Sequence, residues 1–251
     1  RAVSISPRTP VQKELGWIPL EQGRLPTAIS LLTDHLQRNA SDYEAYNLLL
    51  KCFYLTDRFE AGESLARTMI KEKAPNSCFH NNEVLCRLLG GNCPPDELGR
   101  IASGAAVSPF IAYNHEVVTE TPRSWGTDYP PLLKLKLLFE EYRFGTPSRA
   151  ARRNTLAVYT TGHARRDIAL PIVTIGSLGA NDIALNDRSV SRRHCVIVNY
   201  PDDVWLYDLG STNGTVVDGQ RLVGHRLLDG VHKVEVGRAS IRIAARSDLL
   251  I

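Results

Sequence analysis

The fold of this chain is decided by two neighbouring stretches, VSRRHCVIV at residues 190–198 and DLGSTNGTVV at residues 208–217. Each stretch carries hydroxyl, guanidinium or amide side chains and then ends in apolar residues, most of them β-branched. Polar residues followed by a β-branched run are typical of a loop that leads into a strand. The two stretches therefore predict two loops at one end of a β-sandwich, where their hydrogen-bond donors can face a ligand.

Short alternating segments, separated by Gly, Asp, Asn or Pro, continue on both sides of these stretches. They fall at residues 156–159, 167–170, 172–175, 182–185, 194–200, 204–209, 215–217, 221–223, 231–236 and 239–243. So many short strands joined by tight turns are typical of two packed antiparallel sheets. The sequence predicts an all-β sandwich over residues 154–251.

The spacing of the loop residues resembles that of the forkhead-associated (FHA) domain, whose pattern is Gly-Arg, then Ser-x-x-His, then Asn-Gly. Here the matching residues are Gly176-Ser177, Ser191-Arg192-Arg193-His194 and Asn213-Gly214. Two further landmarks of the family match at residues 181–185 and 228–230. The resemblance covers the C-terminal part of the chain, and it implies a domain that binds a phosphothreonine-containing protein.

The resemblance also implies a role for each loop residue. In the family, the residue that matches Ser191 donates its hydroxyl to the phosphate, and those that match Arg192 and Thr212 lie beside it. The residue that matches Asn213 hydrogen-bonds the main chain of the peptide. His194 is implied to brace the loop that carries Ser191. Two glycines are expected to have structural roles: Gly214, through a positive φ angle, and Gly176.

One position departs from the family pattern. The residue after Gly176 is usually an arginine that binds phosphate, whereas this chain has Ser177. A hydroxyl keeps Ser177 a candidate ligand, but it cannot replace a bidentate guanidinium. Losing one charge-assisted hydrogen bond costs on the order of 1.5–3 kcal/mol, which corresponds to roughly a ten- to a hundred-fold loss of affinity.

The first half of the chain shows helical periodicity instead. Three positions recur after 34 residues: Gly23, Leu25 and Ala28 correspond to Asp57, Phe59 and Gly62. A helix-turn-helix repeat of about 34 residues resembles the tetratricopeptide repeat. We predict a tail at residues 1–16 and a tetratricopeptide-like helical domain at residues 17–120. A set of antiparallel helices that share a core without belonging to this repeat family is the alternative.

Residues 121–153 are predicted to connect the two domains. The connector contains one predicted helix, Leu132–Phe144, in which Leu135, Leu138 and Phe139 fall on one side together with Leu132. The expected fold class is therefore a multi-domain α + β chain, with a helical domain followed by an all-β sandwich.

Composition limits the possible functions. Residues 152–251 contain 13 Lys and Arg against 10 Asp and Glu, whereas residues 1–151 contain 17 of each, so the net charge of +3 belongs to the C-terminal part. This mild excess suits an acidic or phosphorylated peptide better than nucleic acid. The five cysteines lack C-x-x-C spacing and lie mostly among apolar neighbours, which predicts buried, reduced thiols and a cytoplasmic location. We expect no catalytic residue, metal, cofactor or membrane insertion.

The expected function is that of a non-catalytic signalling adaptor. Its sandwich would bind a phosphothreonine-containing partner, and its helical domain would make a second protein contact. Because Ser177 replaces the usual arginine, a phospho-independent interaction module is an alternative. A third reading is the regulatory tail of a kinase or transcription regulator, with the catalytic or DNA-binding part upstream.

Overall fold

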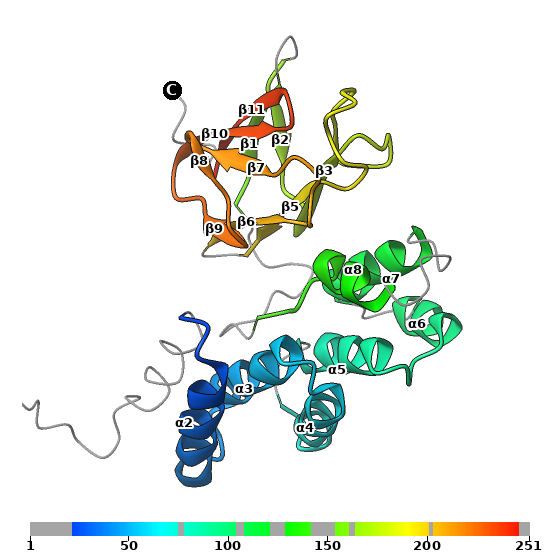
Figure 1. Cartoon of the computed structure of the whole chain (residues 1–251), viewed down its shortest axis with the longest axis vertical. Helices are drawn as coiled ribbons and strands as arrows, with labels where there is room; N and C mark the ends of the chain where they lie inside the picture. Colours follow the sequence, from blue (N-terminus) through cyan, green and yellow to red (C-terminus); the bar gives the residue numbers. More distant parts are fainter. Residues whose placement is uncertain are drawn as a thin grey trace, which may run out of the picture. The chain divides into compact units, whose positions relative to one another are not determined.

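The computed structural model describes residues 22–74, 78–103, 108–120, 129–141, 154–160, 164–200 and 203–245. The chain divides into two compact units (Figure 1). The helical unit comprises residues 1–120 and 137–146, and the β unit comprises residues 121–136 and 147–251. The predicted tail and most of the predicted connector lie outside the described residues.

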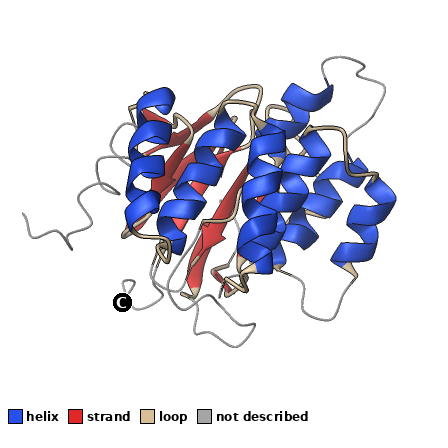
Figure 2. Cartoon of the chain, turned by 90° about the horizontal axis from the view of Figure 1, so that it is seen from below, coloured by secondary structure: helices blue, strands red, loops and turns tan. Residues whose placement is uncertain are grey.

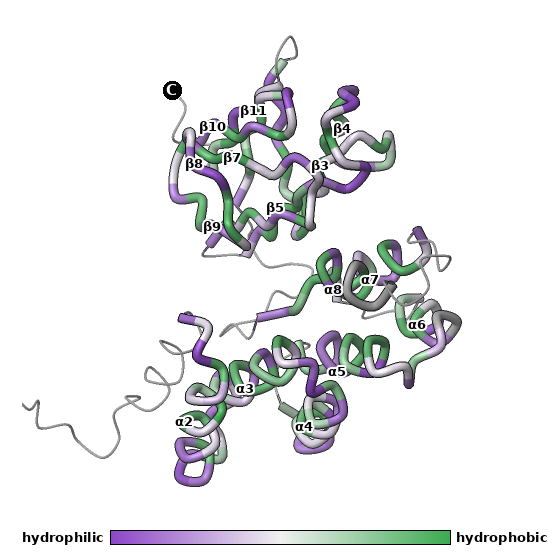
Figure 3. Tube along the Cα trace, in the orientation of Figure 1, coloured by the Kyte–Doolittle hydropathy of each residue, from purple (hydrophilic) through white to green (hydrophobic). Residues whose placement is uncertain are grey.

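The helical unit consists of short helices that follow one another along the chain. They are α2 (Leu25–Arg38), α3 (Tyr43–Leu55), α4 (Phe59–Lys71), α5 (Cys78–Leu89), α6 (Pro95–Ala102) and α7 (Pro109–Glu120). Hydrophobic and hydrophilic residues alternate along these helices, as the periodicity predicts (Figure 3). Leu32, Leu50 and Leu85 are completely buried, so each of α2, α3 and α5 contributes to a core.

The 34-residue interval reappears in the backbone. Gly23, Asp57 and Gly91 all have left-handed φ angles, of 70°, 58° and 80°. Glycine and aspartate both tolerate this conformation, which explains why Asp57 can stand at a position where the repeat usually has glycine. At position 62 the reason for glycine is close packing and not the φ angle. A Cβ on Gly62 would lie 2.7 Å from the Cys86 sulfur on α5. Membership of the tetratricopeptide family stays a prediction.

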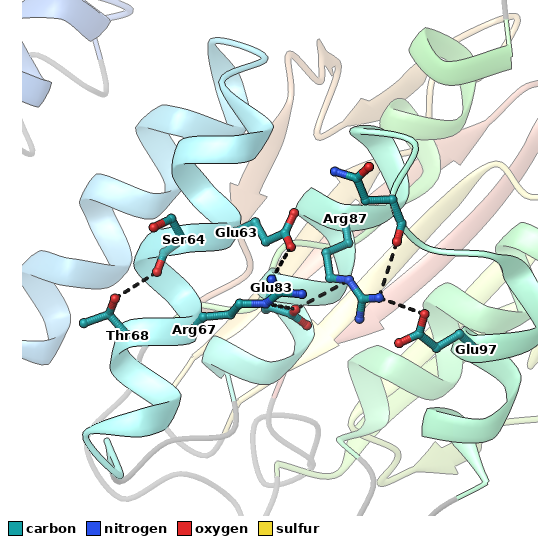
Figure 4. Close-up of polar contacts among 8 residues, drawn as sticks. Glu63, Ser64, Arg67, Thr68, Glu83, Arg87 and Glu97 are labelled. Atoms are coloured by element: carbon teal, nitrogen blue, oxygen red, sulfur yellow. Dashed lines mark hydrogen bonds and ion pairs between the residues drawn. The ribbon is translucent and has the colours of Figure 1, made fainter.

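A chain of partly buried ion pairs links α4, α5 and α6 in the helical unit (Figure 4). Arg67 contacts Glu63 at 2.8 Å and Glu83 at 3.1 Å, and Arg87 contacts Glu83 at 3.6 Å and Glu97 at 2.7 Å. Each arginine contacts two carboxylates, and Glu83 is shared by both. Such a network contributes more to the packing of the three helices than isolated ion pairs would.

The predicted helix Leu132–Phe144 is wrong over its second half. Helix α8 runs over Tyr129–Lys136 and belongs to the β unit, whereas residues 137–141 lie outside any helix and belong to the helical unit. Leu138 and Glu140 direct their main-chain groups to asparagine side chains instead of to a helical turn. These tertiary hydrogen bonds override a local preference for helix. Residues 142–144 of the prediction lie outside the described residues.

The β unit contains two sheets (Figure 1), whose strands are coloured red in Figure 2. The first has the order β2-β1-β11-β10-β7-β8 and the second β4-β3-β5-β6-β9. The strands are β1 (Leu156–Thr160), β2 (Arg166–Ile168), β3 (Ile172–Gly176), β4 (Ile183–Ala184), β5 (Cys195–Asn199), β6 (Val204–Asp208), β7 (Thr215–Val217), β8 (Gln220–Arg221), β9 (His225–Leu227), β10 (Val231–Val236) and β11 (Ala239–Ala244). These bounds confirm the predicted sandwich, and only β9 was not anticipated.

The core of the β unit lies between the two sheets. One hydrophobic cluster contains Ile175 and Ile197 from the second sheet together with Val234 and Ile243 from the first, all at most 1% exposed. Strands β3 and β6 both pair with β5, where Cys195 lies opposite Ile175 and Asp208. This register brings the loops after β3 and β6 to the same end of the sheet as the loop before β5.

All five cysteines are buried and free, as predicted from their neighbours. Burial raises the pKa of the Cys52 thiol to about 11. Within the described ranges, each helix is too short or too polar to cross a bilayer.

Gly176 gives a direct test of how closely these loops pack. A Cβ at this position would overlap the main-chain carbonyl of Arg192 and lie 2.9 Å from the Asn181 amide nitrogen. We expect Gly176→Ala to lower the free energy of unfolding of the β unit by about 1–3 kcal/mol, because main chain must move to make room. Urea unfolding followed by Trp205 fluorescence, with Trp17 and Trp125 changed to Phe, measures this.

The matched control for this substitution is Gly179→Ala. Nothing lies within 4 Å of a Cβ built at Gly179, so this change should leave the unfolding midpoint almost unaltered. Equal stabilities of the two variants would contradict the close approach of β3 to the loop before β5.

Candidate functional site

Three loops meet at one end of the second sheet: residues 177–182 after β3, residues 185–194 before β5 and residues 209–214 after β6. The first two are joined by main-chain hydrogen bonds from Ser177 N–H to Ser191 O (3.0 Å) and from Leu178 N–H to Arg192 O (3.2 Å). The third is joined to the second by Thr212 N–H, which donates to Ser191 Oγ at 3.1 Å. The structure therefore places four of the predicted ligand residues together.

The hydroxyl groups of Ser191 and Thr212 face each other across two loops. Their oxygens are 3.4 Å apart, a long distance for a hydrogen bond between hydroxyls. Ser191 Oγ accepts from Thr212 N–H, which leaves its own hydrogen to the weak contact with Thr212 Oγ1. An anionic oxygen would be a stronger acceptor for that hydrogen than a neutral hydroxyl. Thr212 is exposed and Ser191 half-buried, so a ligand from solvent can reach both.

The His194 side chain contacts both the loop before β5 and the loop after β6. Its Nδ1 accepts from Ser191 N–H at 3.1 Å, and its Nε2 lies 3.1 Å from the carbonyl oxygen of Gly214. This pair of partners requires a neutral ring protonated at Nε2. The imidazole is completely buried, and burial lowers its pKa, although the Gly214 carbonyl and Asp208 act in the opposite direction. The ring is thus held in the form that both partners need, and the bracing role implied by the FHA resemblance fits this geometry.

Asp208 organises the third loop, and sequence reasoning did not select it. Its carboxylate accepts from Ser211 N–H (2.8 Å), Ser211 Oγ (2.7 Å) and Thr215 Oγ1 (2.6 Å). Burial raises the pKa of this carboxyl, but these hydrogen bonds outweigh it and the net pKa lies below its usual value. An aspartate at the end of a strand, followed by Leu-Gly-Ser-Thr, is a turn signal that could have identified it.

Asn213 and Gly214 form the tip of the third loop. The exposed Asn213 donates from Nδ2 to the carbonyl oxygen of Ser189 at 2.7 Å, which ties it to the loop before β5. Gly214 has a φ angle of 77°, so the predicted positive angle is confirmed. A Cβ at Gly214 would also lie 2.6 Å from the Arg221 guanidinium. All five predicted ligand positions thus lie on loops that contact one another.

Arg192 follows Ser191 directly in the chain, and Lys136 lies near enough to Arg192 and Arg193 for their charges to interact. Arg192 is exposed, whereas Arg193 is buried. Lys136, at the end of α8, belongs to the same unit: burial lowers its pKa, and the nearby charges of Arg193 and Arg192 lower it further. No sequence pattern links Lys136 to these loops, because their proximity arises only in the folded chain. Arg192, Arg193 and Lys136 bring three positive charges to this part of the β unit, where the carboxylate of Asp208 also interacts with Lys136.

Comparisons with known proteins found a family match and several similar solved structures. The family model of the FHA domain matches residues 173–237. Among solved structures, the FHA domain of CT664 from Chlamydia trachomatis is 28% identical over 37% of this chain and 97% of that chain, with a TM-score of 0.34. The FHA domain of Saccharomyces cerevisiae Rad53 with a phosphothreonine peptide is 24% identical over 38% of this chain and 95% of that chain, with a TM-score of 0.35.

One solved structure matches along most of the chain. Mycobacterium tuberculosis EmbR, in complex with a low-affinity phosphopeptide, is 16% identical over 94% of this chain and 55% of that chain, with a TM-score of 0.37. The comparison with curated proteins gave no match. From the family match and the two observed sheets, residues 173–237 of this chain form an FHA domain, and a helical region precedes it.

Proposed function

We propose that this chain is a non-catalytic signalling adaptor whose FHA domain binds a phosphothreonine-containing partner. The observation that carries the proposal is the pair of hydroxyls of Ser191 and Thr212, 3.4 Å apart on different loops and next to the exposed Arg192. A phosphate group needs several charged or polar donors that converge on its oxygens, and these three side chains can supply them. The FHA family match supports the same ligand.

The proposal includes a second protein contact, made by the helical unit. It also divides the chain into a helical domain and an FHA domain. The separate hydrophobic clusters of the two parts support this division. A reducing compartment such as the cytoplasm suits a chain with five buried, free cysteines.

Ser177 favours a second candidate function, a phospho-independent interaction module that uses the same loops. Its main-chain N–H is already engaged by Ser191 O, and its side chain carries no charge. Without the usual arginine, less of the binding energy comes from the phosphate. A partner would then be recognised mainly through its main chain and neighbouring side chains.

A titration with a phosphothreonine peptide library and its unphosphorylated copy tests the first candidate. We expect preferential binding of the phosphorylated peptides. We also expect Ser191→Ala and Arg192→Ala each to weaken it about ten- to a hundred-fold, because each removes a donor to a charged group. Arg242→Ala, an exposed arginine on β11, is the matched control and should bind like the unmodified chain. Equal affinities for both peptide forms, unchanged by Ser191→Ala, would exclude a phosphate site here.

Restoring the arginine separates the two candidate functions. If the phosphate pocket is intact, Ser177→Arg should raise the affinity for phosphorylated peptides by roughly ten- to a hundred-fold and leave unphosphorylated peptides unaffected. Ser177→Gln, which adds length without charge, controls for size. Isothermal titration calorimetry of the three proteins gives the comparison. An equal gain for both peptide forms would favour the phospho-independent module.

A further inference from the structure

A short piece of the chain lies against a row of buried asparagines in the helical unit. Residues 137–141 follow α8 without regular structure, and their neighbours include Asn47 on α3, Asn82 on α5 and Asn114 on α7. Together with Asn81, these asparagines are at most 1% exposed. Buried amides are costly unless they are hydrogen-bonded, so their partners indicate what this site is built to hold.

The first clamp holds Leu138. Its main-chain N–H donates to Asn114 Oδ1 at 2.8 Å, and its carbonyl oxygen accepts from Asn114 Nδ2 at 3.0 Å. The same carbonyl also accepts from Asn81 Nδ2 at 3.1 Å. One asparagine therefore binds both main-chain groups of a single residue, as a neighbouring β-strand would.

The second clamp repeats this arrangement two residues later. Glu140 N–H donates to Asn82 Oδ1 at 2.9 Å, and its carbonyl oxygen accepts from Asn82 Nδ2 at 2.8 Å and from Asn47 Nδ2 at 3.2 Å. Clamps on alternate residues fit the two-residue period of an extended chain. They recognise main chain, which every peptide has, so the amides alone do not require this particular segment.

Side-chain contacts add selectivity to the clamps. Ser108 Oγ, at the start of α7, donates to the Glu140 carboxylate at 2.8 Å, where the helix N-terminus also favours a negative charge. Lys51 Nζ contacts Glu141 at 2.6 Å. Phe139 packs on Tyr54 with ring centroids 5.5 Å apart, and Leu137 is buried. The site thus suits an extended segment with two apolar residues, an aromatic residue and two acids.

We propose that the helical unit is a peptide-binding site, that residues 137–141 are its intramolecular ligand, and that an extended partner segment of the same apolar-aromatic-acidic pattern replaces them. This identifies the chemistry of the second protein contact of the helical unit, and it does not depend on the FHA loops. Attachment to the same chain gives residues 137–141 a high effective concentration, which keeps the site closed to weak competitors.

The test uses the full chain with residues 137–141 replaced by a Gly-Ser sequence of equal length. The probe is a synthetic peptide with the sequence of residues 134–143, KLKLLFEEYR. We expect saturable binding to the replaced chain and a peptide-dependent rise in its melting temperature, because a ligand that binds only the folded state stabilises it. The unmodified chain should bind the probe at least about ten-fold more weakly, since its own segment competes.

Two control peptides separate the clamps from the side-chain contacts. A peptide N-methylated at the positions of Leu138 and Glu140 keeps every side chain but lacks both N–H donors, so it should not bind. A peptide with Lys in place of both acids should bind more weakly. No binding of the probe to a folded replaced chain, or equal binding of the N-methylated peptide, would overturn the proposal.

Hydrogen exchange of the unmodified chain gives an independent answer if the replaced chain does not fold. A replaceable ligand must leave its clamps without unfolding the helices. The amides of Leu138 and Glu140 should therefore exchange faster than the core amides of α5, through local opening. If these amides exchange only together with those of α3, α5 and α7, the segment is an integral part of the core and the proposal is wrong. Phosphopeptide binding is unaffected by either result.

Discussion

The loop end of the β unit depends on one buried imidazole. His194 accepts a hydrogen bond from the main chain of Ser191 and contacts the carbonyl oxygen of Gly214, so a single side chain connects the loop before β5 with the loop after β6. A neutral histidine has one donor and one acceptor, and burial favours this neutral form. The ring satisfies main chain on both loops, and the hydroxyls of Ser191 and Thr212 lie between the same two loops, Thr212 exposed and Ser191 half-buried.

The sandwich, and the loops that carry the candidate site, could be predicted because their signals are local. Alternating β-branched residues identify strands, and the glycine at position 214 marks a tight turn before β7. Strand β9 was missed because His225–Leu227 has no alternation of its own, and it forms by pairing with Trp205–Tyr207 on β6. Lys136 was missed for a similar reason, since it approaches Arg192 only through the folded chain.

The segment after Lys136 shows where local signals fail. Leucines at helical spacing predict a helix through Leu138, but the asparagines that decide its conformation lie far away in the sequence. Asn82 and Asn114 satisfy the main-chain groups of Glu140 and Leu138 in an extended geometry that a helix cannot offer. In this part of the chain, hydrogen bonds from buried asparagine side chains to the main chain determine the conformation, and the helical spacing of the leucines does not.

The two candidate binding regions use different chemistry, and this difference has a consequence for affinity. In the proposed function the FHA loops offer hydroxyls and cations to an anionic side chain, and Ser177 stands in place of the charged donor of the family pattern. The asparagine clamps of the helical unit offer neutral amides to main chain. A partner that carries both a phosphothreonine and an extended acidic segment would bind the second region intramolecularly once the first is engaged. Effective concentrations in the millimolar range then raise the overall affinity without any new contact. The proposed phosphate site, without the usual arginine, would therefore still allow strong and selective binding of a partner whose linker spans both regions.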